Sequence, residues 1–259
     1  MSAYFWFERP SRALRLLSRD LTNFTTPMIS VLIPVYNESE RIQGTIAALR
    51  SLPYEFEIVV VDDGSSDDTA QHAEQSGADV VFRQKNMGKG SALATAFRFA
   101  KGETLLLLDG DIGSSATEAY HLLEPILKGE ADMTIALFPV IPGKGGGSGF
   151  VVQRAREGIK RLTGHLLQAP LSGQRAMRRE VLERCGFAAG WGMEVALTVR
   201  ALRAGYRTLE IPTQMTHRVT GRDWASRLHR LKQYLSVGRV LRMLESETST
   251  RQKEAPKHG

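Results

Sequence analysis

The stretch from Glu103 to Asp111, Glu-Thr-Leu-Leu-Leu-Leu-Asp-Gly-Asp, constrains the fold of this chain more than any other. A run of four leucines is typical of a strand that is covered on both faces, as in a parallel sheet. Two carboxylates, Asp109 and Asp111, follow at once, and open α/β sheets hold their ligands at the carboxyl ends of strands. Because residues i and i+2 of an extended chain point the same way, both carboxylates are expected to face one ligand.

The chemistry of this carboxylate pair suits a divalent cation. Hard oxygen donors this close together favour Mg²⁺ or Mn²⁺ bridging to a phosphate, so Asp109 and Asp111 are candidate metal ligands. Gly110 between them is expected to leave room for a close approach. The competing interpretation is a polar turn after a strand, and this stretch alone leaves both open.

Strand-like and helix-like segments alternate along the chain, which predicts an α/β fold with a largely parallel sheet and helices on both faces. Strands are expected near 29–34, 56–61, 79–82, 104–108, 132–138 and 206–211, and helices near 42–49, 91–100, 117–127, 150–167 and 195–203. Asn37 is expected to cap the first of these helices. Residues 170–179 are expected to form a basic turn that leads into a short helix.

Four regions are expected along the chain. Residues 1–28 form a basic and aromatic appendage, 29–221 the main domain, 222–244 a basic amphipathic helix, and 245–259 a disordered tail. A basic helix with an apolar face either packs on its own domain or lies on a membrane surface. Both interpretations stay open for 1–28, and packing is the default for 222–244.

Charge and cysteine content limit the classes of function. The formal net charge of +6 fits phosphate-bearing ligands, an anionic membrane surface or nucleic acid. Nucleic acid is the weakest of these because the basic residues form no recognised binding motif. The single cysteine, Cys185, excludes an internal disulfide and favours the cytoplasm. No apolar run reaches the length of a membrane span, so contact with the inner face of the cell membrane would be peripheral.

Further polar clusters lie near the same predicted edge of the sheet. Asp62 and Asp63 follow a second apolar strand. Lys89 stands between two glycines before a helix, where backbone amides and an ammonium can face a phosphate, although a surface turn has the same pattern. Glu194 opens a helix, where capping and catalysis are both open. A lone histidine such as His217 is more often structural than a ligand.

Taken in order, these stretches resemble the nucleotide-sugar glycosyltransferases of the GT-A fold, family 2 type. The motifs that carry the resemblance are Pro34-Val-Tyr-Asn-Glu38, Val61-Asp-Asp-Gly-Ser-Ser-Asp67, Gly88-Lys-Gly90, Asp109-Gly-Asp111, Ser172-Gly-Gln-Arg175, Gly190-Trp-Gly-Met-Glu194 and His217-Arg218. Two branches are similar: the dolichyl- or polyprenyl-phosphate glycosyltransferases and the glucosyl-3-phosphoglycerate synthases. The resemblance implies a Rossmann-like mixed sheet, a UDP- or GDP-sugar donor, and Mg²⁺ or Mn²⁺ as cofactor.

The resemblance also implies which residues bind the donor. Pro34, Tyr36 and Glu38 would line the nucleoside pocket. Asp63 would contact the base, and Lys89 would lie at the diphosphate.

Other residues would serve the metal and the transfer step. Asp109 would lie near the ribose, and Asp111 with His217 would hold the metal, which neutralises charge on the departing phosphate. Arg218 would add positive charge there. Glu194 would act as base in an inverting reaction or orient the sugar in a retaining one. Asp111 and Glu194 are therefore the candidate catalytic residues.

The sequence departs from both branches at positions near the acceptor. Phe138 stands where the polyprenyl-phosphate enzymes carry an arginine, and Phe150 where the phosphoglycerate enzymes carry one. The acceptor is therefore unidentified: a polyprenyl phosphate, a lipid or a small polar molecule. Two other functions stay open, a sugar-phosphate nucleotidyltransferase and a non-catalytic module that binds a nucleotide or a membrane.

Overall fold

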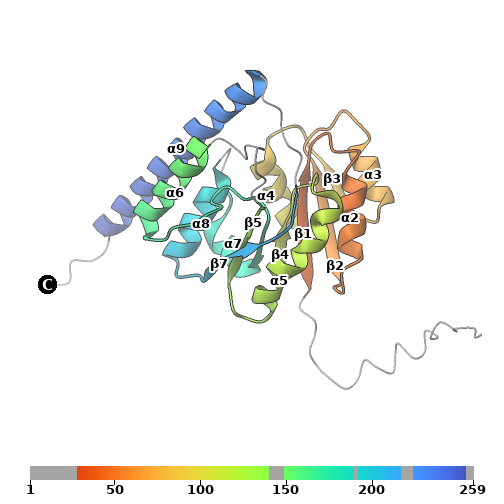
Figure 1. Cartoon of the computed structure of the whole chain (residues 1–259), viewed down its shortest axis with the longest axis horizontal. Coiled ribbons are helices and arrows are strands. Elements are labelled where there is room, and N and C mark those ends of the chain that lie inside the picture. The colour runs from red at the N-terminus through yellow and green to blue at the C-terminus, as the bar shows by residue number, and fades with distance from the viewer. Residues whose placement is uncertain (1–27, 140–148, 189–191, 217–223, 255–259) are drawn as a thin grey trace, which may run out of the picture.

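The structure is a computed structural model that describes residues 28–139, 149–188, 192–216 and 224–254 (Figure 1). Within the last helix, side chains are described for residues 232–247. Most of the predicted appendage, most of the glycine-rich segment 143–149, and the stretch that contains His217 and Arg218 lie outside the described residues.

A seven-stranded mixed sheet forms the centre of the molecule. Its strands are β1 (Ile29–Val35), β2 (Phe56–Asp62), β3 (Val80–Arg83), β4 (Thr104–Leu107), β5 (Met133–Leu137), β6 (Arg175–Arg178) and β7 (Thr208–Pro212), in the order β3-β2-β1-β4-β6-β5-β7. β1 pairs in parallel with β2 and β4, β2 with β3, and β5 with β7. β6 runs antiparallel to β4 and β5. The predicted α/β class with a mostly parallel sheet is confirmed.

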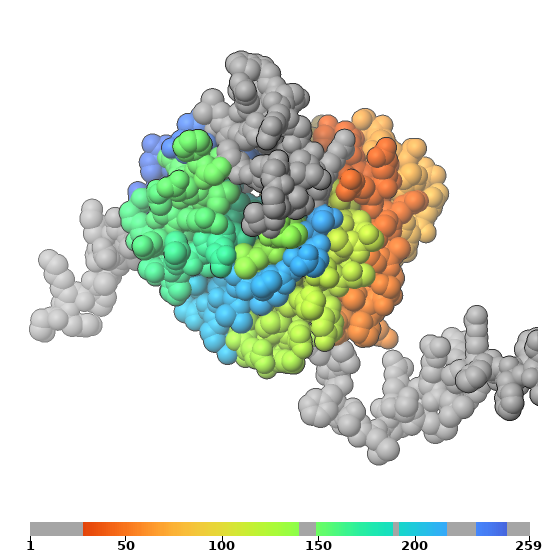
Figure 2. All heavy atoms as spheres, in the orientation of Figure 1, coloured from red at the N-terminus to blue at the C-terminus, as the bar shows by residue number. Residues whose placement is uncertain are grey.

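Helices cover both faces of this sheet, as the sequence predicted (Figure 1). They are α2 (Ile42–Arg50), α3 (Thr69–Gln75), α4 (Lys89–Phe99), the 3-10 helix η1 (Gly113–Glu118), α5 (Ala119–Leu127), α6 (Gly149–Thr163), α7 (Arg179–Cys185), α8 (Met193–Arg203) and α9 (Trp224–Glu254). One apolar cluster packs α4, α6, α7, α8 and α9 against the sheet. A second packs α2, α3, η1 and α5 against the other face. Figure 2 shows the surface that α2, α5, β7 and α6 form on one side of the molecule.

The leucine run is buried on both sides, which confirms the prediction made from it. Each of the four residues from Leu105 to Leu108 is at most 2% exposed. Leu105 and Leu107 enter the cluster beneath α4 and α8, while Leu106 and Leu108 enter the cluster beneath α2 and α5. Alternate side chains of a strand point to opposite faces, so a sheet with helices on both faces needs an uninterrupted apolar run here.

Two local predictions of helix positions were wrong. Asn37 does not cap α2, because that helix begins after Arg41 and has no side-chain cap. Asn37 instead adopts a positive φ of 55° in the turn after β1. The helix predicted for 150–167 ends earlier, at Thr163.

The basic turn predicted for 170–179 contains the strand β6. Its sequence, Arg-Ala-Met-Arg, has only two apolar residues and a charge at each end, so it lacks the apolar pattern of a buried strand. Pairing with β4 and β5 on its two sides decides the structure, not local propensity.

The helix predicted for 222–244 is present from Trp224, the first described residue of that range, and continues as α9 to Glu254. Residues 245–254 are therefore helical where a disordered tail was expected. Two acidic residues support this extension. Glu245 pairs with Arg161 of α6 at 2.5 Å, and Glu247 pairs with Arg200 of α8 at 2.6 Å. Within the residues that the structure describes, no helix is both long and apolar enough to cross a membrane.

Candidate active site

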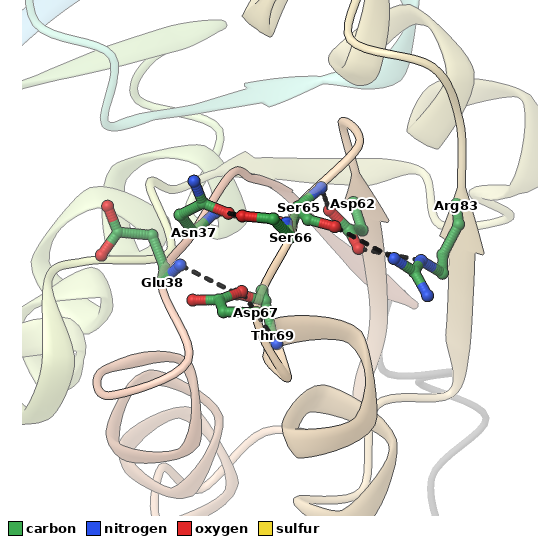
Figure 3. Close-up of polar contacts among 8 residues, drawn as sticks. All are labelled: Asn37, Glu38, Asp62, Ser65, Ser66, Asp67, Thr69 and Arg83. Atoms are coloured by element: carbon green, nitrogen blue, oxygen red, sulfur yellow. Dashed lines mark hydrogen bonds and ion pairs between the residues drawn. The ribbon is translucent and has the colours of Figure 1, made fainter.

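The loops after β1 and β2 are joined by hydrogen bonds at the carboxyl end of the sheet (Figure 3). The backbone amide of Asn37 donates to Ser65 Oγ, and the amide of Ser66 donates to Asn37 Oδ1, both at 2.9 Å. The amide of Glu38 donates to Thr69 Oγ1 at 2.9 Å. The two loops therefore form one fixed unit, and Figure 3 shows the Glu38 carboxylate directed away from it.

Asp62 is a structural residue of this unit. Its side chain is fully buried, and its carboxylate accepts a hydrogen bond from the amide of Ser65 at 2.8 Å. Its other oxygen lies 3.1 Å from Arg83 Nε. The arginine compensates the charge of the buried carboxylate, and the backbone amide satisfies one of its oxygens. Asp62 therefore stabilises the turn after β2.

Asp63 holds the loop that leads into α4. Its carboxylate accepts hydrogen bonds from Gln84 Nε2 at 2.7 Å, from the amide of Met87 at 2.9 Å and from the amide of Gly88 at 2.7 Å. Asp63 is only 4% exposed. Its carboxylate therefore fixes the segment immediately before Lys89, a role that the sequence did not indicate.

Lys89, the first residue of α4, lies between two carboxylates. Its Nζ is 2.6 Å from Asp109 Oδ1 and 3.6 Å from Glu194 Oε1. Burial alone would lower the pKa of Lys89, but the charges of Asp109 and Glu194 outweigh it and raise that pKa above its usual value. Lys89 is therefore a permanent ammonium ion at neutral pH. Lys89, Asp109 and Glu194, which the sequence analysis predicted separately, lie together here.

The segment before β6 completes this cluster. Gln174 Nε2 donates a hydrogen bond to Asp109 Oδ2 at 3.0 Å. Gln174 is 2% exposed, and its Oε1 has no hydrogen-bond partner among the described residues. A Cβ atom on Gly173 would lie 2.4 Å from Lys89 Nζ, so the lysine occupies the space that any larger residue would need.

Arg175 connects this segment to α8, which carries Glu194. Its side chain is 1% exposed; Nε donates to the carbonyl of Ser172, and Nη1 donates to Thr198 Oγ1, each at 2.8 Å. Burial lowers the pKa of Arg175 to about 10, with Glu194 acting in the opposite direction. The sequence contained the motif from Ser172 to Arg175 but gave no role to Gln174 or Arg175. The signal that could have indicated a role for Gln174 and Arg175 is their position next to the apolar pair of a short buried strand.

The loop from Asp109 to Asp111 is held from α2. Thr45 Oγ1 donates to the carbonyl of Gly110 at 2.8 Å, and Arg41 Nη1 donates to the carbonyl of Asp111 at 3.0 Å. A Cβ on Gly110 would lie 2.5 Å from Val35 Cγ1. A residue without a Cβ is therefore favoured there by packing against β1, a reason that the sequence did not indicate.

The remaining predicted residues lie around the same end of the sheet. Pro34 is in β1, and Tyr36 follows it with 51% of its surface exposed. His217 and Arg218 lie outside the described residues. The last described residue before them, Thr216, donates its amide to Ser115 Oγ of η1 at 3.0 Å. Within the described part of the chain, no three residues of the types His, Cys, Asp and Glu gather as a metal site.

The mixed sheet with helices on both faces is that of a GT-A glycosyltransferase. Residues 30–186 match the model of the family described as glycosyl transferase family 2, and the chain belongs to this family. Family membership confirms the resemblance seen in the motifs. It favours sugar transfer over the nucleotidyltransferase and the non-catalytic module.

Individual relatives are similar over different lengths. The chain is 32% identical over 209 residues to glycosyltransferase AglJ of Haloferax volcanii, which covers 77% of this chain and 66% of AglJ. It is 36% identical over 106 residues to the undecaprenyl-phosphate 4-deoxy-4-formamido-L-arabinose transferase of Pseudomonas fluorescens, covering 37% of this chain and 31% of that protein. The chain thus spans less than two thirds of the length of either relative.

Among solved structures, the fold is similar to glucosyl-3-phosphoglycerate synthase of Mycobacterium tuberculosis. That crystal structure is a complex with Mn²⁺, uridine diphosphate and phosphoglyceric acid. The TM-score is 0.70 at 27% identity, over 85% of this chain and 78% of that one.

Proposed function

We propose that this protein transfers a sugar from a nucleoside diphosphate sugar to a phosphate-bearing acceptor, with Mg²⁺ or Mn²⁺ as cofactor. The observation that carries the proposal is the Lys89 ammonium held between Asp109 and Glu194 at the carboxyl end of the sheet. A UDP-linked donor is favoured over a GDP-linked one because a solved relative binds uridine diphosphate. Undecaprenyl phosphate and phosphoglyceric acid, which are named with two of the relatives, share a phosphate group.

The donor would lie across the ends of β1, β2 and β4. Pro34, Tyr36 and Glu38 would line the nucleoside pocket. Asp63 would contact the nucleobase. The exposed ring of Tyr36 offers a stacking surface. Lys89 would meet the diphosphate, since an ammonium at a helix N-terminus is a favourable place for an anion.

The metal would be held by Asp109 and Asp111 together with His217. Carboxylate and imidazole donors fit a divalent cation, which when bound neutralises charge on the leaving diphosphate. The bond between Thr216 and Ser115 supports this set, because Ser115 follows Asp111 by only four residues. Arg218, next to His217, would add a second positive charge.

The ion pair between Lys89 and Asp109 implies an order of events at the site. Asp109 Oδ1 is engaged by Lys89 and Oδ2 by Gln174. A diphosphate that draws the ammonium toward itself would release Asp109 Oδ1 toward the metal. Donor and metal would therefore bind together more tightly than either alone.

Glu194 would face the transferred sugar or the acceptor. For an acceptor that reacts through a hydroxyl, its carboxylate would be the general base. An acceptor that reacts through a phosphate oxygen is already nucleophilic and would need no base. The proposed reaction belongs in the cytoplasm, and peripheral contact with the inner face of the cell membrane would bring a lipid-linked acceptor to the site.

The test is a panel of UDP- and GDP-sugars with Mn²⁺, followed by product analysis with undecaprenyl phosphate and with 3-phosphoglycerate. We expect turnover of a UDP-sugar that requires the divalent cation and is lost in Asp111→Ala. The matched control is Glu130→Ala, which removes an exposed carboxylate after α5. Turnover that survives Asp111→Ala or needs no divalent ion would contradict the metal role. Release of pyrophosphate from a nucleoside triphosphate would favour a nucleotidyltransferase.

A further inference from the structure

The outer face of α9 carries a continuous row of basic and apolar side chains. In the part of α9 whose side chains are described, the exposed residues are Lys232, Leu235, Arg239, Arg242, Met243 and Ser246. Their spacing of three and four residues places them on one side of the helix. We refer to these six residues as the α9 stripe. It contains three cations, two large apolar side chains and no carboxylate.

The acidic residues of the same segment form ion pairs with arginines of neighbouring helices. Glu245 pairs with Arg161 of α6, and Glu247 pairs with Arg200 of α8. The buried face of α9 is apolar and packs in the cluster with α6 and α8 through Val237, Val240, Leu241 and Leu244. The helix is therefore anchored by one face. Among the residues of α9 whose side chains are described, the charged residues of the opposite face are all positive.

A groove of about 350 Å³ between α6 and α9 adjoins the stripe. Three guanidinium groups line it, those of Arg154, Arg161 and Arg242, against two carboxylates, those of Glu157 and Glu245. Arg154 also stacks over the ring of Tyr234 at 4.1 Å. Guanidinium groups suit phosphate oxygens, so the groove has the chemistry to take a phosphate headgroup.

We infer that the α9 stripe is a docking face for an anionic phospholipid surface. Cations on a helix surface are attracted to anionic headgroups, while Leu235 and Met243, 49% and 38% exposed, can enter the interfacial region. Figure 1 shows α9 running alongside α6 from the end of the molecule at which β1, β2 and β4 finish.

The composition of the stripe argues against a second copy of the chain as its occupant. A twofold interface brings the same patch of both copies together, which would set three cations against three cations. The buried centre of a protein interface is also depleted of charged residues. A negatively charged, partly apolar surface is complementary to both the cations and the apolar side chains of the stripe.

The experiment is co-sedimentation of the full chain with vesicles of phosphatidylcholine, with and without phosphatidylglycerol, at low and high salt. We expect binding that requires phosphatidylglycerol and weakens with salt. The variant Lys232→Gln/Arg239→Gln/Arg242→Gln should bind about a hundredfold more weakly, since each cation near an anionic surface contributes about fivefold. Glutamine keeps helix propensity, and circular dichroism verifies that the variant is folded.

The matched control removes the same number of charges at the other end of the sheet, in Arg98→Gln/Lys101→Gln/Lys128→Gln, and should bind as the wild type does. A second variant, Leu235→Ser/Met243→Ser, should weaken binding at low and high salt alike. Equal binding of the stripe variant and the wild type would overturn the inference. So would wild-type binding that is indifferent to lipid charge, a stripe-dependent dimer in light scattering, or binding to duplex DNA without binding to vesicles. Because vesicle binding is measured without turnover, this inference and the proposed function can fail separately.

Discussion

Lys89 Nζ lies 2.6 Å from Asp109 Oδ1, which joins the first residue of α4 to the loop directly after β4. The two side chains come from positions 20 residues apart in the sequence. They meet because β3 and β4 run in the same direction, so the helix that follows β3 begins at the edge of the sheet at which β4 ends. Glu194 of α8 lies 3.6 Å from the same ammonium. One cation thus links α4, the β4 loop and α8, so changes to it should affect all three.

Replacing Lys89 by methionine should weaken the binding of UDP and leave the binding of uridine unchanged. The ammonium would face the diphosphate, and a charged hydrogen bond of this kind contributes about 1.5–3 kcal/mol, or about 10- to 100-fold in affinity. Calorimetric titration with UDP and uridine in the presence of Mn²⁺ measures both. Lys85→Met, an exposed position in the preceding loop, is the control. A parallel loss for uridine would show that Lys89 acts only on the fold.

Replacing Gly173 by alanine should disturb the site more than the fold. The new Cβ would lie 2.4 Å from Lys89 Nζ, so the flexible lysine must leave Asp109. We expect the free energy of unfolding to change by less than about 1 kcal/mol while the affinity for UDP falls. Chemical denaturation and calorimetry give the two quantities. Gly149→Ala, where a Cβ meets nothing within 4 Å, is the matched control, and unchanged UDP affinity in Gly173→Ala would contradict the prediction.

The strands that carry the site could be predicted because their apolar runs are long enough to identify them without tertiary information. Leu105 to Leu108 is the clearest case, since a helix on each face of the sheet requires every residue of the run to be apolar. The same logic located Asp109 and Asp63 at the carboxyl end of the sheet. The separate motifs predicted that Asp109 and Asp63 lie at the carboxyl end of the sheet. They did not predict that Lys89, Asp109 and Glu194 would be in contact.

What could not be predicted depends on contacts between distant segments. Arg175 is buried in a four-residue strand because Thr198 and backbone carbonyls satisfy its guanidinium, and no local pattern announces those partners. Asn37 has the composition of a helix cap, yet the neighbouring loop after β2 offers it Ser65 and Ser66 instead. Gly110 packs against Val35 of the adjacent strand, a contact between distant residues that the local sequence does not indicate.

Replacing Gly110 by alanine should destabilise the protein by about 1–3 kcal/mol, because the new Cβ would lie 2.5 Å from Val35 Cγ1 in a packed core. The double variant Gly110→Ala/Val35→Ala removes the clash. We therefore expect its loss of unfolding free energy to be smaller than the sum of the two single losses. Urea denaturation of the four proteins measures this coupling. If the losses of the two single variants were additive in the double variant, the destabilisation by Gly110→Ala would not come from contact with Val35.

Asp132 should stabilise the protein in a pH-dependent way. Hydrogen bonds from the Arg207 side chain lower the pKa of Asp132 below its usual value, against the opposing effect of burial. A depressed folded-state pKa stabilises the fold above the unfolded-state value of about 3.9, and this contribution is lost as the pH falls through the folded-state pKa. The difference in unfolding free energy between wild type and Asp132→Asn should therefore be constant near neutral pH and shrink below about pH 4. Glu130→Gln should show no such change, and a difference independent of pH would contradict the ionic role.

Replacing Glu194 by glutamine should separate the two kinds of acceptor. Glutamine keeps the shape of the side chain and leaves Lys89 paired with Asp109, so the fold and the affinity for UDP should be retained. For an acceptor that reacts through a hydroxyl, loss of the general base should lower transfer about 10²- to 10⁴-fold. For undecaprenyl phosphate, whose phosphate oxygen is already ionised, transfer should fall by less than about tenfold, because no proton must be removed. Rates with 3-phosphoglycerate and undecaprenyl phosphate, measured at saturating donor, distinguish these outcomes. An equal loss with both acceptors would show that Glu194 acts on the sugar and not on the acceptor proton.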